Sequence, residues 1–187
     1  MSAAAELERI AGEVRPCQKC ELYATRKNAV PGEGPADAKV MIVGEAPGSN
    51  EDEQGRPFVG SAGRNLDSLL SKAGLARSDV FITNVVKCRP PGNRRPKRKE
   101  LDSCHPYLRR QIEAISPRLI VLLGDTALKE FFPDSTLADL HGKVTKRGGS
   151  RFFASYHPAS MIYNRALSAT LDEDFRKLGD AVREKSD

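Results

Sequence analysis

Residues 39–63 read KVMIVGEAPGSNEDEQGRPFVGSAG, and this stretch decides the fold. Its first five residues, 39–43, form a short apolar run that predicts a buried strand. The glycine-rich segment 44–60 follows directly, and a helix is predicted over 61–73 because its leucines recur at helical spacing. Glycines let the main chain approach a ligand closely, so this order indicates a binding loop at the carboxyl end of a strand.

Strand and helix patterns alternate along the rest of the chain. Apolar and β-branched runs predict further strands over 79–86, 118–123 and 151–156. Helices are expected over 3–13, over 98–115, after Gly124 and from about Ser168. Continuous apolar strands joined by helices are typical of an α/β fold with a parallel sheet covered on both faces. Ligands of such sheets bind beyond the carboxyl ends of the strands, where Asn84, the Gly124 turn and His157 are expected.

The bulk composition is that of an ordinary globular protein. The 187 residues are 39% hydrophobic and 29% charged, and one domain spanning 1–187 is expected, with 3–20 belonging to its metal-binding region. No apolar run is long enough to cross a membrane, and the N-terminal stretch lacks the apolar core of a secretory signal. We therefore expect a cytoplasmic monomer without a membrane partner. The net charge of +5 permits nucleic-acid binding without proving it.

The four cysteines indicate a metal site. Cys17 and Cys20 form a CxxC pair that can chelate a metal from a single turn, and Cys88 and Cys104 flank a basic loop. In an intracellular chain this pattern favours metal ligands over disulfides, with buried free thiols as the alternative. The spacing does not separate zinc from an iron–sulfur cluster, and His105 is an alternative zinc ligand.

The loop between these cysteines is strongly basic. Residues 87–99 read KCRPPGNRRPKRK, and prolines stiffen the segment. Most charged runs are solvated and mobile surface loops. A basic loop tethered at both sides is more typical of a surface that contacts phosphates, which favours a nucleic-acid partner.

Five motifs occur in one order along the chain: GEAPG at 44–48, ED at 51–52, GRPFVGSAG at 55–63, NVVKCRPPGNR at 84–94 and SYHPAS at 155–160. In this combination, with four cysteines in place, the chain resembles the family 4 uracil-DNA glycosylases from Cys17 to about Leu178. The resemblance implies a three-layer α/β/α sandwich with a central four-stranded parallel sheet, a 4Fe–4S cluster, and a bacterial or archaeal repair enzyme. Its partner would be uracil-containing DNA, single- or double-stranded.

The resemblance also implies roles for individual residues. The cluster ligands would be Cys17, Cys20, Cys88 and Cys104. Phe58 would stack on the extruded uracil, Asn84 would read its edge, and His157 would contact its O2 atom. A side-chain amide offers one donor and one acceptor, which match O4 and N3–H of uracil but not the reversed pattern of cytosine. A donor at O2 stabilises the negative charge that develops on the leaving base.

The glycine-rich loop supplies the remaining pocket residues. Glu51 resembles the residue that blocks the 5-methyl group of thymine, and Glu45 lies in the water-activating motif. The best-known branch of the superfamily has an aspartate directly after this glutamate, where the chain has Ala46. We therefore expect Ala46 to line the substrate pocket, Glu45 to position water modestly, and leaving-group stabilisation to provide most of the rate.

Two segments are expected to contact DNA. Arg89, Arg94 and Arg95 of the basic loop would meet the backbone. Ser160 and Met161 lie in a segment that resembles the wedge loop of the superfamily, with Met161 the side chain expected to enter the base stack. The alternative for Met161 is packing against the C-terminal helix.

Two other functions are weighed against uracil excision. A non-catalytic DNA-binding module could use the metal to shape its basic loop. A glycosylase relative could stay covalently linked to the abasic sugar, but the branch known for this has a histidine in an insertion after the second strand. Residues 88–100 contain no histidine, which ranks this alternative last.

Overall fold

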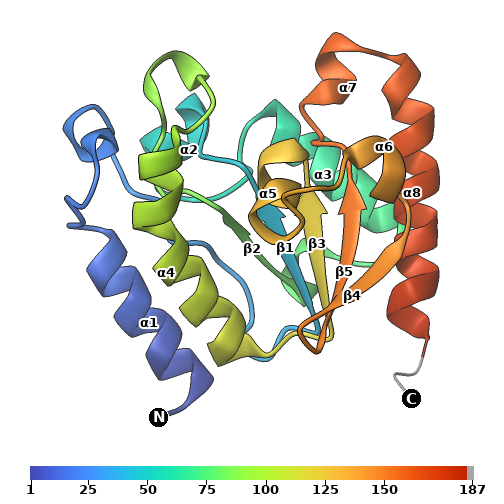
Figure 1. Cartoon of the computed structure of the whole chain (residues 1–187), viewed down its shortest axis with the longest axis horizontal. Helices are drawn as coiled ribbons and strands as arrows, with labels where there is room; N and C mark the ends of the chain where they lie inside the picture. The colour runs from blue at the N-terminus through green and yellow to red at the C-terminus, as the bar shows by residue number, and fades with distance from the viewer. Residues whose placement is uncertain (185–187) are drawn as a thin grey trace.

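The apolar runs predicted as strands lie side by side in one sheet. In the computed structural model, which describes residues 1–184, they form β1 (Val40–Gly44), β2 (Val80–Asn84), β3 (Leu119–Leu123) and β5 (Ser150–Ser155). These four strands pair in parallel in the order β2-β1-β3-β5 (Figure 1). Every residue of β1, β2 and β3 is buried, as expected for strands covered on both faces.

The sheet also has a strand that was not predicted. β4 (Val144–Arg147) pairs antiparallel with β5 at the edge, so the sheet has five strands and its parallel part has the predicted four. The segment is short, polar and largely exposed, and it therefore carries none of the apolar signal that marks a buried strand. Gly148 and Gly149 adopt positive φ angles in the turn that joins β4 to β5.

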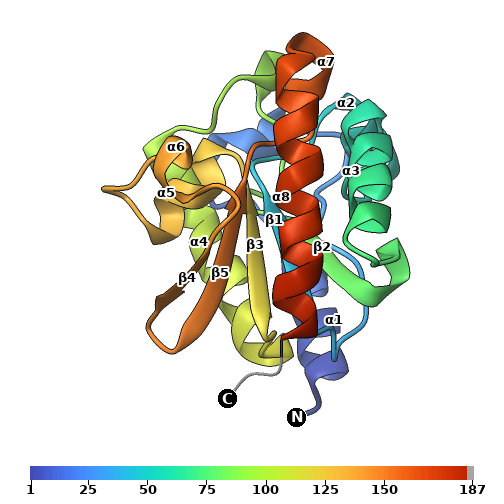
Figure 2. The same cartoon turned by 90° about the vertical axis from the view of Figure 1, so that its right-hand side faces the viewer.

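Helices cover both faces of this sheet, which confirms the predicted three layers (Figure 2). On one face lie α4 (Arg98–Ile115) and α5 (Asp125–Phe131), with α1 (Ala3–Val14) packed against α4. On the other face lie α3 (Ser61–Lys72) and α8 (Ala166–Arg183). The α3 leucines that carried the helical spacing are fully buried there, beside Phe175 and Leu178 of α8.

Short elements occupy the connections. These are η1 (Glu21–Ala24), α2 (Ser49–Gln54), η2 (Arg77–Asp79), η3 (Pro91–Asn93), α6 (Leu137–Leu140) and α7 (Ser160–Tyr163). The predicted glycine loop thus contains a short helix, α2. The first helix was expected over 3–13, and α1 ends one residue later, at Val14. The segments leading to α2 and α7 follow β1 and β5, so both helices lie near the carboxyl edge of the sheet (Figure 1).

None of the helices within residues 1–184 is both long and apolar enough to cross a membrane. The single domain over 1–187 stays a prediction, and its last three residues, 185–187, lie outside the described part of the chain.

Candidate active site

The carboxyl ends of the parallel strands open into one pocket with a volume of about 540 Å³. Predicted site residues from three loops line it: Glu45, Ala46, Glu51, Phe58, Asn84, Arg94, Arg95 and His157. Gly124 and Asp125, which follow β3, complete the wall. The rule that ligands bind at the carboxyl edge of a parallel sheet therefore identifies the same place as the motifs do.

Asn84 is the last residue of β2 and pairs in register with Gly44 of β1. Its side chain is 2% exposed, and within residues 1–184 its Oδ1 is the one buried side-chain oxygen or nitrogen without a hydrogen-bond partner. A buried polar atom left unpaired is costly, by about 1–3 kcal/mol. The unpaired acceptor lies on the pocket wall, where it is available to a donor.

The Phe58 ring lies directly against these two strand ends. It is 5% exposed and stacks on the His157 ring, with centroids 5.5 Å apart and an interplanar angle of 23°. A Cβ at Gly44 would come within 2.7 Å of Phe58 Cζ and 2.4 Å of Asn84 Oδ1. Gly44 is thus the position where only a hydrogen fits between the ring and the amide.

The Glu51 carboxylate joins the two halves of the glycine loop. Its Oε1 accepts hydrogen bonds from the backbone N–H groups of Val59 (2.9 Å) and Gly60 (3.0 Å), and its Oε2 accepts one from Gly48 (3.1 Å). The side chain is 9% exposed. Glu51, in the first turn of α2, therefore has a fixed position on the pocket wall.

Glu45 is held by a partner that the sequence did not identify. Its Oε2 accepts a hydrogen bond of 2.5 Å from the Oγ1 hydroxyl of Thr126, a buried residue in the first turn of α5. Thr126 follows β3 by three residues, so its place beyond a strand end was the available signal. The neighbouring Ala46 lines the pocket on one side and packs towards the cysteines on the other.

His157 is held as a neutral imidazole. The backbone N–H of Ala159 lies 3.1 Å from Nδ1 and can only donate, so Nδ1 accepts and the ring proton lies on Nε2. Burial lowers the pKa of His157 to about 4, although the nearby Glu51 carboxylate acts to raise it. At neutral pH the pocket therefore contains an uncharged N–H donor.

The predicted DNA-contacting arginines differ in their surroundings. Arg94 makes a two-pronged ion pair with the buried Glu100, at 2.9 and 2.7 Å. Arg95 is exposed at the pocket rim and lies 3.3 Å from Asp125. Arg89 does not line the pocket, and its Nε donates to Asn93 Oδ1. The loop is thus braced by its own side chains, with Arg95 the most open of the three.

The segment after His157 forms α7. Ser160 Oγ donates to the carbonyl oxygen of His157, at 2.6 Å. Met161 is half-buried and packs against the core next to α8, in agreement with the alternative considered for it. Ile162 and Tyr163 are instead 50% and 87% exposed and line the mouth of the pocket. The wedge assignment to Met161 stays a prediction, and Tyr163 is the more protruding side chain.

All four cysteines line one narrow cavity. Cys17 and Cys20 are half-buried, Cys88 and Cys104 are buried, and none is in a disulfide. Arg26 Nη1 lies 3.2 Å from Cys88 Sγ and the Lys87 N–H lies 3.3 Å from Cys104 Sγ, so both sulfurs have donors suited to thiolates. Within residues 1–184, no three His, Cys, Asp or Glu side chains form a group that could hold a single metal ion.

Lys87 lies between the cysteine cavity and the pocket. Its fully buried ammonium donates to Thr83 Oγ1 (2.6 Å), the Asn84 carbonyl oxygen (2.7 Å) and Gln111 Oε1 (2.8 Å). Burial lowers its pKa to about 8, against the opposing influence of Cys104. Sequence reasoning counted Lys87 with the exposed basic loop, because the burial of a lysine is not visible in a charge pattern.

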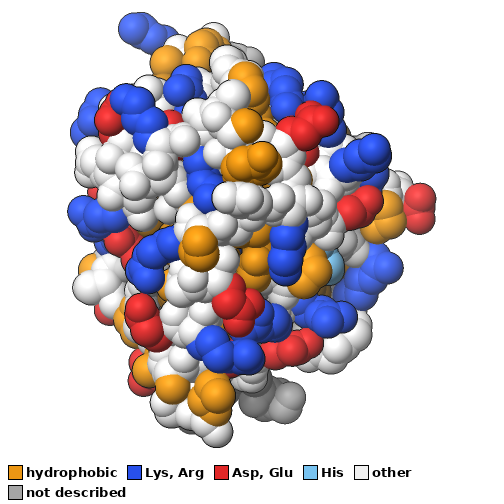
Figure 3. Space-filling view, turned by 90° about the vertical axis from the view of Figure 1, so that its left-hand side faces the viewer, with side chains coloured by type: hydrophobic (Ala, Val, Ile, Leu, Met, Phe, Trp, Pro, Cys, Tyr) orange, Lys and Arg blue, Asp and Glu red, His pale blue; other side chains and the backbone are white. Residues whose placement is uncertain are grey.

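Basic side chains do not gather into one patch on the face shown in Figure 3, which carries α1. Lys and Arg side chains are interspersed there with acidic and apolar ones. Arg110 illustrates this mixing, since it bridges Glu6 and Glu13 of α1. This face therefore shows no continuous basic patch of the kind that would attract a DNA backbone.

Comparison with known proteins gives a consistent result. The sequence profile of the Uracil DNA glycosylase superfamily matches residues 31–180. Three similar proteins are named type-4 uracil-DNA glycosylase. That of Saccharolobus solfataricus is 48% identical and covers 96% of this chain and 88% of its own length. That of Sulfurisphaera tokodaii is 48% identical and covers 92% of this chain and 83% of its own length. That of Archaeoglobus fulgidus is 44% identical and covers 96% of this chain and 94% of its own length.

Proposed function

The chain belongs to the type-4 branch of the uracil-DNA glycosylase superfamily, and from this premise we propose how its pocket binds and releases uracil. Enzymes of this kind act in DNA repair and cleave the bond between uracil and its deoxyribose. A base inside a duplex is out of reach of active-site groups, so the nucleotide is flipped into the pocket. Uracil-containing DNA, single- or double-stranded, is therefore the partner.

The unpaired Oδ1 of Asn84 is the observation that carries the proposal. It accepts the N3–H of uracil, while the amide N–H groups donate to O4. Cytosine has no hydrogen on N3 and has an amino group in place of O4, so it would leave both ends of the amide unpaired. Because unpaired buried groups are costly, this contact supports rejection of cytosine.

Phe58 and Glu51 shape the rest of the base pocket. The Phe58 ring supplies the face on which uracil stacks, next to the Gly44 backbone. Glu51 is immobilised by three backbone N–H groups, and a fixed side chain is what a steric screen against a 5-methyl group requires. Thymine would therefore be excluded by shape and cytosine by hydrogen bonding.

His157 stabilises the leaving group. As the N-glycosidic bond breaks, negative charge develops on uracil O2, and the neutral imidazole donates its Nε2–H there. Because the pKa of His157 is about 4, the imidazole is neutral at neutral pH and donates its own Nε2–H without first taking up a proton from solvent. Glu45, oriented by Thr126, positions the water that attacks the sugar as it becomes cationic. Because position 46 is an alanine, no second carboxylate at this place helps Glu45 to position the water.

Cys17, Cys20, Cys88 and Cys104 would hold a 4Fe–4S cluster. The shared cavity supports this set, as do the donors to two of the sulfurs. Burial raises the pKa of Cys104 to about 12, although Lys87 acts to lower it, so a thiolate here requires a compensating cation. When bound, the cluster supplies a rigid tether for the residues between Cys88 and Cys104, and the chemistry at uracil needs no electron from it.

Arg89, Arg94 and Arg95 would lie along the DNA backbone beside the pocket, with Ser160 at the base of α7. A side chain of α7 would fill the gap left by the flipped nucleotide. Exposure favours Tyr163 or Ile162 for this part over Met161.

The base assignment is tested with free bases and single-turnover kinetics. Free uracil is expected to inhibit the enzyme, and free cytosine and thymine are not. Asn84→Ala should lower the excision rate, measured as alkali-labile strand breaks, by about 100-fold and abolish inhibition by uracil. Gln54→Ala changes an exposed amide on α2 and is the matched control. Inhibition of Asn84→Ala by uracil at wild-type concentrations would contradict the assignment.

The cluster assignment is tested separately. Aerobically purified protein should be brown and contain iron, and Cys88→Ser should lose the visible absorption band. His105→Ala should retain it, because the alternative zinc set is the one that includes His105. A colourless wild-type protein with stoichiometric zinc would overturn the cluster, and unchanged DNA affinity in metal-free Cys88→Ser would overturn its tethering role.

A further inference from the structure

The backbone at Phe58 adopts a conformation that its residue type disfavours. Its φ angle is +50°, in the left-handed region where a bulky side chain is uncommon. Gly63 in α3 packs closely against the same peptide, because a Cβ added at Gly63 would lie only 1.9 Å from the Phe58 carbonyl oxygen. Such a conformation persists only when its surroundings hold it, and it is frequent at functional sites.

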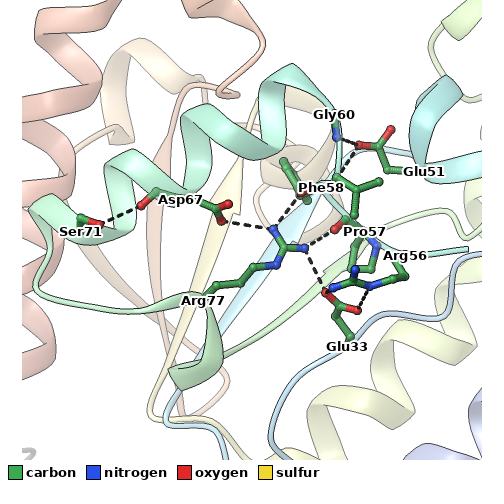
Figure 4. Close-up of polar contacts among 10 residues, drawn as sticks. Glu33, Glu51, Arg56, Pro57, Phe58, Gly60, Asp67, Ser71 and Arg77 are labelled. Carbon is green, nitrogen blue, oxygen red and sulfur yellow. Dashed lines mark hydrogen bonds and ion pairs between the residues drawn. The ribbon is translucent and has the colours of Figure 1, made fainter. Parts of the chain in front are cut away.

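Arg77 of η2 is the side chain that reaches this backbone. Its Nη1 donates to the carbonyl oxygen of Phe58 at 2.8 Å, and its Nη2 donates to that of Pro57 (Figure 4). One planar guanidinium thus binds two consecutive carbonyl oxygens and does not itself line the pocket. A guanidinium has fixed donor directions, so this grip defines the orientation of both peptides.

Acidic side chains hold Arg77 in turn. Its Nη2 lies 3.1 Å from Glu33 and its Nη1 lies 3.3 Å from Asp67 (Figure 4). Glu33 also receives two hydrogen bonds from Arg56, at 2.9 and 3.0 Å. Partial burial acts to raise the pKa of Glu33, but the bonds from Arg56 and Arg77 lower it, so the carboxylate stays charged. Glu33 and Asp67 therefore hold the Arg77 guanidinium in a fixed position relative to the loop.

The same loop is held from its other side by Glu51. The N–H groups of Val59 and Gly60 donate to the Glu51 carboxylate, directly after the two carbonyls that Arg77 binds. A cation thus fixes the carbonyls of 57–58 and an anion fixes the amides of 59–60. Phe58 lies between these two anchors, with its ring packed against Gly44.

We propose that Arg77 is a positioning residue that holds the Phe58 ring where it stacks on uracil, by binding the carbonyl oxygens of Pro57 and Phe58. This inference rests on the proposed stacking role of Phe58. Arg77 itself does not line the pocket, so its effect on catalysis passes through the ring.

Arg77→Met keeps the length of the side chain and removes both donors. It should lower the single-turnover excision rate by about 10- to 100-fold, because a small misplacement of a contacting group is enough for such a loss. Arg77→Lys, which keeps the charge and one direction of donation, should give an intermediate rate. Arg176→Met is the matched control, since Arg176 is an exposed arginine of α8 that pairs with Glu173, and its rate should change less than about twofold.

A double-mutant cycle separates positioning from general stabilisation. When Phe58→Ala has removed the ring, Arg77→Met should slow excision less than about twofold further, whereas a structural role would give the same loss in both backgrounds. Equal losses would overturn the inference, and so would an undiminished rate for Arg77→Met in the wild-type background. An unchanged rate for Phe58→Ala alone would instead contradict the stacking role on which it rests. Melting temperatures of all variants identify any that are unfolded.

Discussion

The pocket wall (residues 44–63) and the rim segment (residues 159–163) face the same cavity but are built differently. In the wall, hydrogen bonds fix both side chains and backbone. The Glu51 carboxylate accepts from the Val59 N–H, and the Phe58 carbonyl oxygen accepts from Arg77. In the rim segment, Ile162 and Tyr163 expose their side chains. The difference indicates a division of labour. A wall fixed in advance can discriminate one base, while an open rim can adapt to a DNA strand.

Gly44→Ala is the strongest way to break the wall. The added methyl group would overlap both Asn84 Oδ1 and Phe58 Cζ, so the single-turnover rate should fall by 100-fold or more, to about the level of Asn84→Ala. Gly12→Ala is the control, because a Cβ at Gly12 would meet nothing within 4 Å outside its own helix and an alanine suits the interior of α1. A Gly44→Ala enzyme with more than a tenth of the wild-type rate would show that the wall is not tightly fitted.

Thr126→Val tests the support of Glu45 at the edge of the wall. Loss of one hydrogen bond, typically about 0.5–1.5 kcal/mol, should slow excision by about 3- to 10-fold. In a Glu45→Gln background, Thr126→Val should slow excision little further, because both residues act on the same water. Thr136→Val, which alters the cap of α6 at a residue that does not line the pocket, is the control. Additive losses in the double variant would separate Thr126 from Glu45.

Tyr163→Ala and Met161→Ala test the rim segment. Tyr163→Ala should weaken DNA binding by about 3- to 10-fold with little change in melting temperature, because its side chain is exposed. Met161→Ala should mainly lower the melting temperature, since Met161 packs against the core. Both are read by fluorescence anisotropy of labelled DNA and by thermal melting. The reverse pattern would restore Met161 as the wedge.

The burial of His157 should also make the stability of the protein depend on pH. Its pKa is about 4 in the folded protein and ordinary in the unfolded one, so the unfolded state binds more protons between about pH 4 and 6.5. Stability from this group is therefore complete above pH 6.5 and decreases as the pH falls towards 4. The wild-type melting temperature should drop more than that of His157→Gln between pH 7 and 5. Equal drops would show that His157 is not buried as a neutral ring.

Much of the fold was predictable because buried parallel strands have a strong local signature. β1, β2, β3 and β5 were all expected within two residues of their ends, and α4 was expected over its observed range. β4 was missed because an exposed edge strand needs no apolar residues. The motifs identified the pocket residues Phe58, Asn84 and His157, whose chemistry is local to each side chain.

The supporting partners could not be predicted in this way. Thr126 and Arg77 act on residues that are distant in the chain. The local signal for Thr126 was its place just beyond a strand end, and nothing in the neighbourhood of Arg77 marks it. Lys87 was grouped with an exposed loop, although its ammonium is completely buried. These roles depend on which strand ends become neighbours, and that pairing is a property of the assembled sheet.

By itself the sequence determined the α/β class, the family and the residue types that line the pocket, because these depend on periodicity and on the order of motifs. Only the tertiary structure decided that Asn84 keeps an unpaired oxygen, that His157 carries its proton on Nε2, and that Phe58 is held at a positive φ angle. The physical reason is that hydrogen-bond satisfaction and burial are set by neighbours brought together in space. The loop at 44–63 encodes the pocket wall, and the contacts around it give the wall its shape.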